Sequence, residues 1–300
     1  MKRVIVAGAL MALLSVEARA QGRIFGMQAE QKGPGVIVPP YGQPEGQGGA
    51  LIVEFDPLDG STLNSFPPPV PAGFGPDGLA FDGTTLWFVT GGAMEGAGTL
   101  YALDPDDGSV LDTHTINGGS GGFDGLAALQ GLIYVMDYPN NDIVVFSPAL
   151  ETVVDILDID GSNPGYDIIG GLGAIDQPDA LLATGGQPLE GGGSNELLEI
   201  DPSSGAIVDS FPLAARFTAG VATVGQTIYA ADIDLPVVTL YDRAGGVIDI
   251  FNGTGPFSAL GGDPQPAVGI PTASTLGLAI LALLLVAGGL IVLYRRPRTS

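Results

Sequence analysis

The sequence predicts an all-β fold built from about five repeated four-stranded units, with one helix added at each end. Three observations predict it. Short apolar runs separated by Gly and Asp recur every 46 to 49 residues through the middle of the chain. Each period contains four such runs, and uninterrupted apolar stretches of helical length occur at the two ends. Four short strands in a period near 45 residues are typical of a β-propeller, here of five or six blades.

The first element is a secretory signal peptide over residues 1–20. Lys2 and Arg3 precede a short apolar core at 4–14, and Ala18-Arg19-Ala20 forms a small-x-small cleavage pattern. The apolar core is too short to span a membrane. The alternative is a buried core helix.

Residues 21–49 are rich in Gly, Pro and Gln, which predicts an irregular arm. Within it, only 23–25 and 36–38 could pair as strands.

The repeated units occupy residues 50–260. Each full unit starts with Gly-[Leu/Val]-[Ala/Gly], at Gly78, Gly125, Gly171 and Gly220, spaced by 47, 46 and 49 residues. Three further strands follow in each unit: 86–89, 132–135, 180–183 and 227–230, then 100–103, 144–146, 198–200 and 239–241, then 109–111, 152–154, 206–208 and 247–250. A lone meander of this size is marginally stable, so the units must pack together.

The turns between third and fourth strands have the form Asp-Pro-x-x-Gly, as in 104–108 and 201–205. Asp accepts hydrogen bonds from its own backbone, Pro presets φ, and Gly takes the positive φ. The same turn at 56–60 shows a fifth, partial unit. Its missing inner strands would come from 36–38, or from 257–260 closing the ring from the far end. A β-sandwich is the rival architecture.

Over residues 50–251, the units resemble the repeats of YVTN, NHL and quinoprotein-like propellers. The shared pattern is Gly-Leu-Ala, Asp-Gly, Leu-Trp-x-Val, Leu-Tyr and Asp-Pro-x-x-Gly. The resemblance implies the fold and leaves the activity open.

The C-terminal region reads as a linker with a polar motif (261–275), an apolar helix (276–294) and a basic tail (295–300). At 1.5 Å per residue, the helix would reach roughly 28 Å, close to the ~30 Å of a bilayer core. The basic tail would stay cytoplasmic, with the acidic body outside.

This region resembles the IPTL-CTERM sorting signal, which is similar in plan to PEP-CTERM signals. The matching residues are Ile270, Pro271, Thr272, Gly277, Arg295 and Arg296, while Ala273 and Leu276 stand where the family usually has Leu and Trp. The resemblance implies a Gram-negative bacterium, export across its inner membrane, and an exosortase-type sorting protease as partner. The protein would then be membrane-anchored, at the cell surface or extracellular. The alternative is a permanent single-span anchor.

Composition excludes several functions. Without the signal and the tail, 4 basic and 32 acidic residues remain, a net charge of 4 − 32 = −28. Such a chain does not neutralise phosphate, so nucleic acid and anionic lipid surfaces are not expected partners. The absence of cysteine excludes disulfides, thiol catalysis and Cys zinc sites.

Catalytic residues are not expected. His114 is the one histidine, placed on an outer strand where we expect it to be exposed, and one histidine cannot make a histidine-based zinc site. The Gly-x-Ser-x-Gly match around Ser120 lies in a connection between blades rather than in a strand-to-helix turn.

Two sets of carboxylates are candidate metal ligands. Calcium is the possible cofactor of Asp158, Asp160, Asn163 and Asp167, although the EF-hand Glu is missing and Ile169 stands at its position. Similarity to propeller lactonases points to Asp77, Asp124 and Asp232 as channel carboxylates. The alternative for both sets is the capping of turns.

The sequence therefore favours an exported, surface-displayed propeller that binds an unknown extracellular ligand without catalysis. A metal-dependent propeller hydrolase or lactonase is the alternative, and a purely structural envelope protein is a third class.

Overall fold

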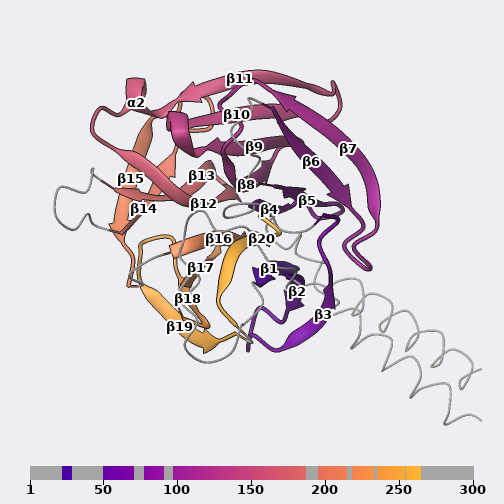
Figure 1. The fold of residues 1–300 in the computed structure, drawn as a ribbon. Coiled ribbons are helices and arrows are strands. Elements are labelled where there is room, and N and C mark those ends of the chain that lie inside the picture. Colours follow the sequence, from indigo (N-terminus) through magenta and orange to yellow (C-terminus); the bar gives the residue numbers. More distant parts are fainter. Residues whose placement is uncertain are drawn as a thin grey trace, which may run out of the picture. The chain divides into compact units, whose positions relative to one another are not determined.

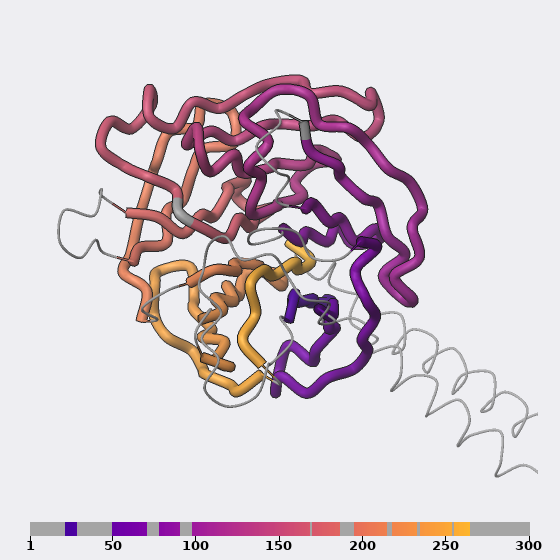
Figure 2. The backbone as a smooth tube through the Cα atoms, viewed as in Figure 1, coloured from indigo at the N-terminus to yellow at the C-terminus, as the bar shows by residue number. Residues whose placement is uncertain are grey.

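Four-stranded antiparallel sheets stand as blades around a common axis in the computed structural model (Figures 1 and 2). The structure describes residues 22–28, 50–70, 78–90, 97–186, 195–214, 218–232, 235–253 and 255–264. These residues form five sheets, so the count of five blades is confirmed and six is excluded for this part of the chain.

Blade 1 combines the two ends of the ring in the order β20-β1-β2-β3. Its strands are β20 (Phe257–Gly262), β1 (Ile24–Gln28), β2 (Leu51–Phe55) and β3 (Thr62–Phe66). The inner strand predicted at 257–260 is confirmed. The second strand, β1, comes from the segment expected as an irregular arm, and 36–38 lies outside the described residues.

Blades 2 to 5 each use four consecutive strands. They are β4 (Gly78–Phe81), β5 (Leu86–Val89), β6 (Ala97–Leu103) and β7 (Val110–Asn117), then β8 (Phe123–Leu129), β9 (Leu132–Asp137), β10 (Asp142–Ser147) and β11 (Thr152–Asp158), then β12 (Asp167–Asp176), β13 (Asp179–Gly186), β14 (Glu196–Ile200) and β15 (Ile207–Pro212), then β16 (Thr218–Val224), β17 (Thr227–Asp232), β18 (Val237–Tyr241) and β19 (Val247–Asn252).

The inner strands β20, β4, β8, β12 and β16 touch backbone to backbone at glycine. A Cβ added to Gly125 would lie 2.3 Å from the backbone nitrogen of Leu172 in the next blade. The equivalent glycines, Gly78, Gly171, Gly220 and Gly261, would place a Cβ 2.4, 2.8, 2.8 and 3.0 Å from the backbone of the following inner strand. The glycine that opens each repeat is therefore needed for close approach around the axis.

The core is divided into five apolar clusters, and each cluster is shared by two neighbouring blades. One example joins blades 1 and 2 through Phe25, Phe81 and Phe88. Burying one such side chain contributes roughly 1.5–3 kcal/mol. The blades therefore depend on one another, because no blade completes a core alone.

A second glycine contact repeats at the outer side of the blades. The turn glycine Gly108 has φ +74°, and an added Cβ would meet the Phe66 ring of the preceding blade at 2.3 Å. The turn glycines Gly60, Gly205 and Gly245 likewise lie against Phe251, Leu157 and Phe211. The positive φ predicted for Gly60, Gly108 and Gly205 is confirmed.

His114 takes the equivalent place on the outer strand of blade 2. Its side chain is only 9% exposed, and its ring centroid lies 5.9 Å from that of Trp87 and 5.4 Å from that of Phe146. The expected exposure of His114 is therefore wrong, because the outer strand turns this side chain into the cluster between blades 2 and 3.

The described helices are η2 (Tyr138–Asn140) and α2 (Ile159–Ser162). No helix among the described residues combines the length and apolar character that crossing a membrane requires. The predicted signal peptide (1–20) and apolar helix (276–294) lie outside the described residues.

Gly125→Ala should destabilise the ring strongly, because its Cβ would meet backbone that cannot turn away. We expect a loss of about 3 kcal/mol, at the upper end of the roughly 1–3 kcal/mol that overpacking typically costs. Thermal unfolding of the purified full chain would measure it. Gly131→Ala is the control, since its Cβ meets no atom within 4 Å although φ is +76°. Equal losses in the two variants would contradict a steric role for Gly125.

Candidate functional site

The blades end in two faces of different construction. The turn face carries the short turns within the blades, such as 82–85, 130–131 and 201–206. The loop face carries the connections between blades, such as 118–122 and 159–166. The described chain also starts and ends at the turn face, where the backbone N–H of Asp263 donates to the Arg23 carbonyl at 3.1 Å.

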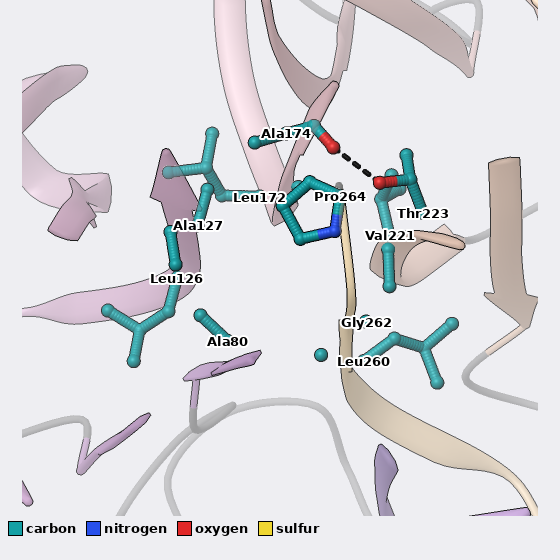
Figure 3. Close-up of a pocket in the computed structure, with 14 residues that line it drawn as sticks. Ala80, Leu126, Ala127, Leu172, Ala174, Val221, Thr223, Leu260, Gly262 and Pro264 are labelled. Carbon is teal, nitrogen blue, oxygen red and sulfur yellow. Dashed lines mark hydrogen bonds between the residues drawn. The ribbon is translucent and has the colours of Figure 1, made fainter. Parts of the chain in front are cut away.

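The axis is closed by apolar side chains of the inner strands (Figure 3). A cavity of about 10 Å³ lies among Ala80, Leu126, Leu172, Val221 and Leu260. This volume is about that of one water-sized sphere, far below the ~300 Å³ at the small end of ligand sites. The ring of Pro264 lies among these side chains, and the Thr223 hydroxyl donates to the Ala174 carbonyl.

A second cavity of about 40 Å³ lies at the turn face and is more polar. Asp82, Gln130, Asp176 and Pro264 line it. The Asp82 carboxylate is held by its own turn, because it accepts from Thr85 N at 2.7 Å and from Trp87 Nε1 at 2.8 Å. Pro264 lines both pockets, so the chain leaves the ring at the axis.

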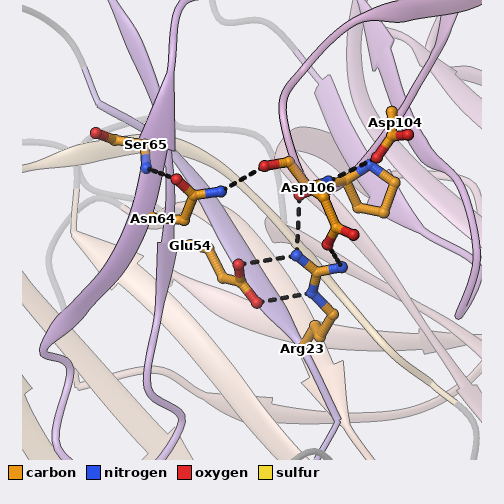
Figure 4. A network of polar contacts seen from close by, with 7 residues as sticks. Arg23, Glu54, Asn64, Ser65, Asp104 and Asp106 are labelled. Atoms are coloured by element: carbon orange, nitrogen blue, oxygen red, sulfur yellow. Dashed lines mark hydrogen bonds and ion pairs between the residues drawn. The ribbon is translucent and has the colours of Figure 1, made fainter.

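Arg23 joins blades 1 and 2 on the turn face (Figure 4). Its guanidinium donates to both carboxylate oxygens of Glu54 at 2.7 and 2.8 Å, to Asp106 at 2.9 Å and to the Pro105 carbonyl at 2.9 Å. Burial lowers the pKa of Arg23, but the bonds and charges of Glu54 and Asp106 outweigh it and raise the pKa overall. A bidentate, half-buried pair of this kind is stronger than an ordinary surface ion pair.

Arg243 makes a corresponding bridge between blades 5 and 4. It pairs with Glu199 and also donates to the carbonyls of Gln177 and Pro178 at 3.1 and 3.3 Å. Arg23 and Arg243 are the basic residues of the described part of the chain, and both are used in joining blades. Neither bridge was predicted from the sequence.

Three carboxylates lie side by side at the loop-face end of blade 3. Asp142 on β10 is opposite Asp137 on β9 and Asp158 on β11. Burial first, then the charges of Asp158, Asp137 and Asp160, raises the pKa of Asp142. Asp137 is fully buried and accepts from Ser120 N at 2.6 Å, from the Ser120 hydroxyl, and from Asn140 Nδ2 at 3.0 Å. Ser120 is thus a structural partner of Asp137.

The candidate calcium ligands lie in and around α2. Two of them, Asp158 and Asn163, form hydrogen bonds with backbone groups. Asp158 caps α2 by accepting from Gly161 N at 2.6 Å, and Asp160 accepts from the Asn141 side-chain amide. Asn163 Nδ2 donates to the Gly205 carbonyl of blade 4 at 2.8 Å, and Asn163 Oδ1 accepts from Ile207 N of the same blade at 2.7 Å. Asp167 starts β12. Within the described ranges, no three His, Cys, Asp or Glu side chains form a group that could hold a metal ion.

The candidate channel carboxylates belong to different strands. Asp124 is buried on the inner strand β8, whereas Asp232 is buried at the end of β17, a second strand, and accepts from Leu235 N at 3.0 Å. Asp77 lies outside the described residues. The six sorting-motif residues, Ile270, Pro271, Thr272, Gly277, Arg295 and Arg296, also lie outside them.

Comparison with solved structures finds proteins that are similar to this chain over much of its length. No protein-family model matches the sequence, and no curated protein does. BamB from Moraxella catarrhalis is 16% identical with a TM-score of 0.35, over 70% of this chain and 60% of BamB, so the chain spans less than two thirds of that protein. Myxococcus xanthus glutaminyl cyclase is 16% identical with a TM-score of 0.40, over 66% of this chain and 74% of that one. A Bacteroides caccae protein of unknown function is 10% identical with a TM-score of 0.48, over 82% and 100%.

Tyr229→Phe should reduce stability and flatten its alkaline pH dependence. The Tyr229 hydroxyl donates to the Pro57 carbonyl of blade 1 at 3.0 Å, and burial, aided by the charge of Asp56, raises the pKa of Tyr229 to about 12. Losing the bond should cost about 1 kcal/mol at pH 7. Because the folded pKa exceeds the unfolded value of roughly 10, this stability is present below pH 10 and falls as pH rises towards 12.

Urea unfolding of wild type and Tyr229→Phe at pH 7 and at pH 11 would measure both effects. The stability difference between the two proteins should shrink at the higher pH. A difference that grows with pH would contradict this assignment.

Asp142→Asn should stabilise the protein slightly at pH 7, because it removes a carboxylate whose ionisation the fold disfavours. The group is largely hydrated, so solvent screening limits the gain to a few tenths of a kcal/mol. The gain should disappear below about pH 4, where the native carboxyl is protonated too. Asp59→Asn is the opposite case, because bonds from Ser61 lower the pKa of Asp59. In thermal melts at pH 7, Asp142→Asn should be more stable than wild type and Asp59→Asn should be less stable. At pH 3.5 the gain of Asp142→Asn should be absent.

Proposed function

We propose that this protein is an exported β-propeller that is held or sorted by its C-terminal region and acts as a non-enzymatic interaction module at the cell surface. Export would use the signal peptide at 1–20, and sorting would use the motif at Ile270-Pro271-Thr272. The partner would be an extracellular macromolecule with a neutral or cationic surface, since the exported body is strongly acidic.

The proposal is supported by the positions at which the propeller begins and ends in the sequence. The closing strand β20 ends at Gly262, and the described chain leaves the axis at Pro264, before the motif at Ile270. At the other end, β1 starts at Ile24, and Arg23 makes the bridge to blade 2. Cleavage after Ala20 or at the motif would therefore remove both apolar ends without touching a strand or a bridge.

The geometry of the axis supports a binding role over chemistry in a central site. The space at the axis is about 10 Å³ and is bounded by backbone that cannot withdraw without breaking the contacts between blades. A partner would meet the two faces and the rim, which suits contact with a macromolecule.

The intact mass of the protein recovered from the envelope and medium of its native host tests this proposal. We expect a chain that starts at Gln21 and ends near Thr272. Pro271→Ala should keep the C-terminal tail, whereas Pro266→Ala, which changes a proline outside the motif, should be processed like wild type. A full-length chain that accumulates in the cytoplasm would refute export, and a mass retaining Arg298 in wild type would refute sorting.

A further inference from the structure

The outer strand of every blade carries one extra residue opposite the third strand. In blade 1, Phe55 faces Thr62 and Glu54 faces Asn64, which leaves Leu63 without a partner. The equivalent unpaired residues in blades 2 to 5 are Leu111, Val154, Val208 and Ile248. All five are exposed aliphatic residues, with 45–59% of their surface accessible. Each is therefore a β-bulge that presents an apolar side chain on an open sheet edge.

The residue after each bulge hydrogen-bonds the next backbone amide with its own side chain. In blade 5, Asp249 Oδ1 accepts from Ile250 N at 2.8 Å. The same bond is made by Asn64, Asp112, Asp155 and Asp209, at 2.7–2.9 Å. We call these five residues the edge caps. The same hydrogen bond therefore recurs at this position in all five blades.

The capped amide points to the open edge of the sheet. Antiparallel ladders alternate between bonded and non-bonded pairs. The blade 5 hairpin starts with a bond from Asp242 N to Gly246 O at 2.9 Å. Counting from that bond through the bulge places Ile250, opposite Thr239, at a non-bonded position whose N–H faces outward. The same count from the turn bonds of blades 1, 2 and 4 applies to Ser65, Thr113 and Ser210.

Two blades carry a second block on the same edge. The next outward-facing position after the capped amide is Pro67 in blade 1 and Pro212 in blade 4. Proline has no N–H and cannot pair with an added strand. Proline and charged residues are established means of preventing pairing at exposed strands.

We propose that the edge caps keep the propeller from adding strands of a second copy of this chain to its outer edges. The ring leaves the outer strands of its five described blades open at one edge. On β19, for example, Val247, Ile248 and Ile250 are exposed. An uncapped edge of this composition is a template for strand pairing. By occupying the outward amide, the side chain removes the donor that an incoming strand needs, while its position beside the bulge keeps the edge irregular.

Asp249→Ala and Asp249→Asn separate the hydrogen bond from the charge. Asn64 shows that an amide side chain makes the cap in blade 1, so Asp249→Asn keeps the bond and loses the charge. We expect Asp249→Ala to self-associate, with the mean mass rising by about twofold or more at high concentration as copies pair edge to edge. The Asn variant should match wild type. Light scattering of the full chain in mild detergent measures the mass.

Hydrogen exchange supplies the local readout. The Ile250 amide should exchange roughly fivefold to tenfold faster in dilute Asp249→Ala than in wild type or Asp249→Asn. Asp209→Ala should associate less than Asp249→Ala, because Pro212 still interrupts that edge. Measuring both variants keeps the test decisive if one of them folds poorly. Association of Asp249→Asn to the same degree as Asp249→Ala would assign the effect to charge and overturn the proposal. An Asp249→Ala protein that stays monomeric would overturn it too.

Discussion

The contact on which this structure depends is the approach of five inner strands, backbone to backbone, at glycine. Each strand presents a glycine to the strand that follows it, and the series Gly78, Gly125, Gly171, Gly220 and Gly261 closes on itself. A side chain at these positions would push two blades apart and open the ring. The same contact narrows the axis, so the centre of the propeller is core. Any functional surface is therefore displaced to the faces and the rim.

Closing the ring also ties the first and last strands of the propeller together. β1 and β20 pair residue by residue although more than two hundred residues separate them, and Arg23 fastens the same corner to blade 2. Because each apolar cluster is shared by two blades, no blade is complete before its neighbours are in place. Stability is thus a property of the closed ring, and the closing strands β1 and β20 are essential to it.

Many of the acidic side chains accept hydrogen bonds from backbone amides in the structure. Asp56, Asp104, Asp201 and Asp242 each accept a hydrogen bond from the amide two residues later in a turn. Four of the five edge caps are also aspartates. Many of the carboxylates that make the chain so negative therefore hold backbone amides. The acidity favours solubility, while the short carboxylate side chains set the geometry of turns and edges.

The repeat length, the strands of blades 2 to 5 and the Asp-Pro-x-x-Gly turns could be derived from the sequence alone, because local spacing and turn chemistry determine them. The sequence also offered 257–260, as an alternative to 36–38, for the strand that closes the ring. Only the tertiary structure decided which N-terminal segment joins that strand, because Ile24–Gln28 has no repeat of its own and is selected by its partner strand. The exposure of His114 was mispredicted for a similar reason: an outer strand alternates between solvent and the next blade, and the bulge decides which side a residue faces. The bridges of Arg23 and Arg243 join separate blades, so only the closed ring brings their charges together. The row of Asp137, Asp142 and Asp158 lies on three consecutive strands of blade 3, and the register of those strands sets it.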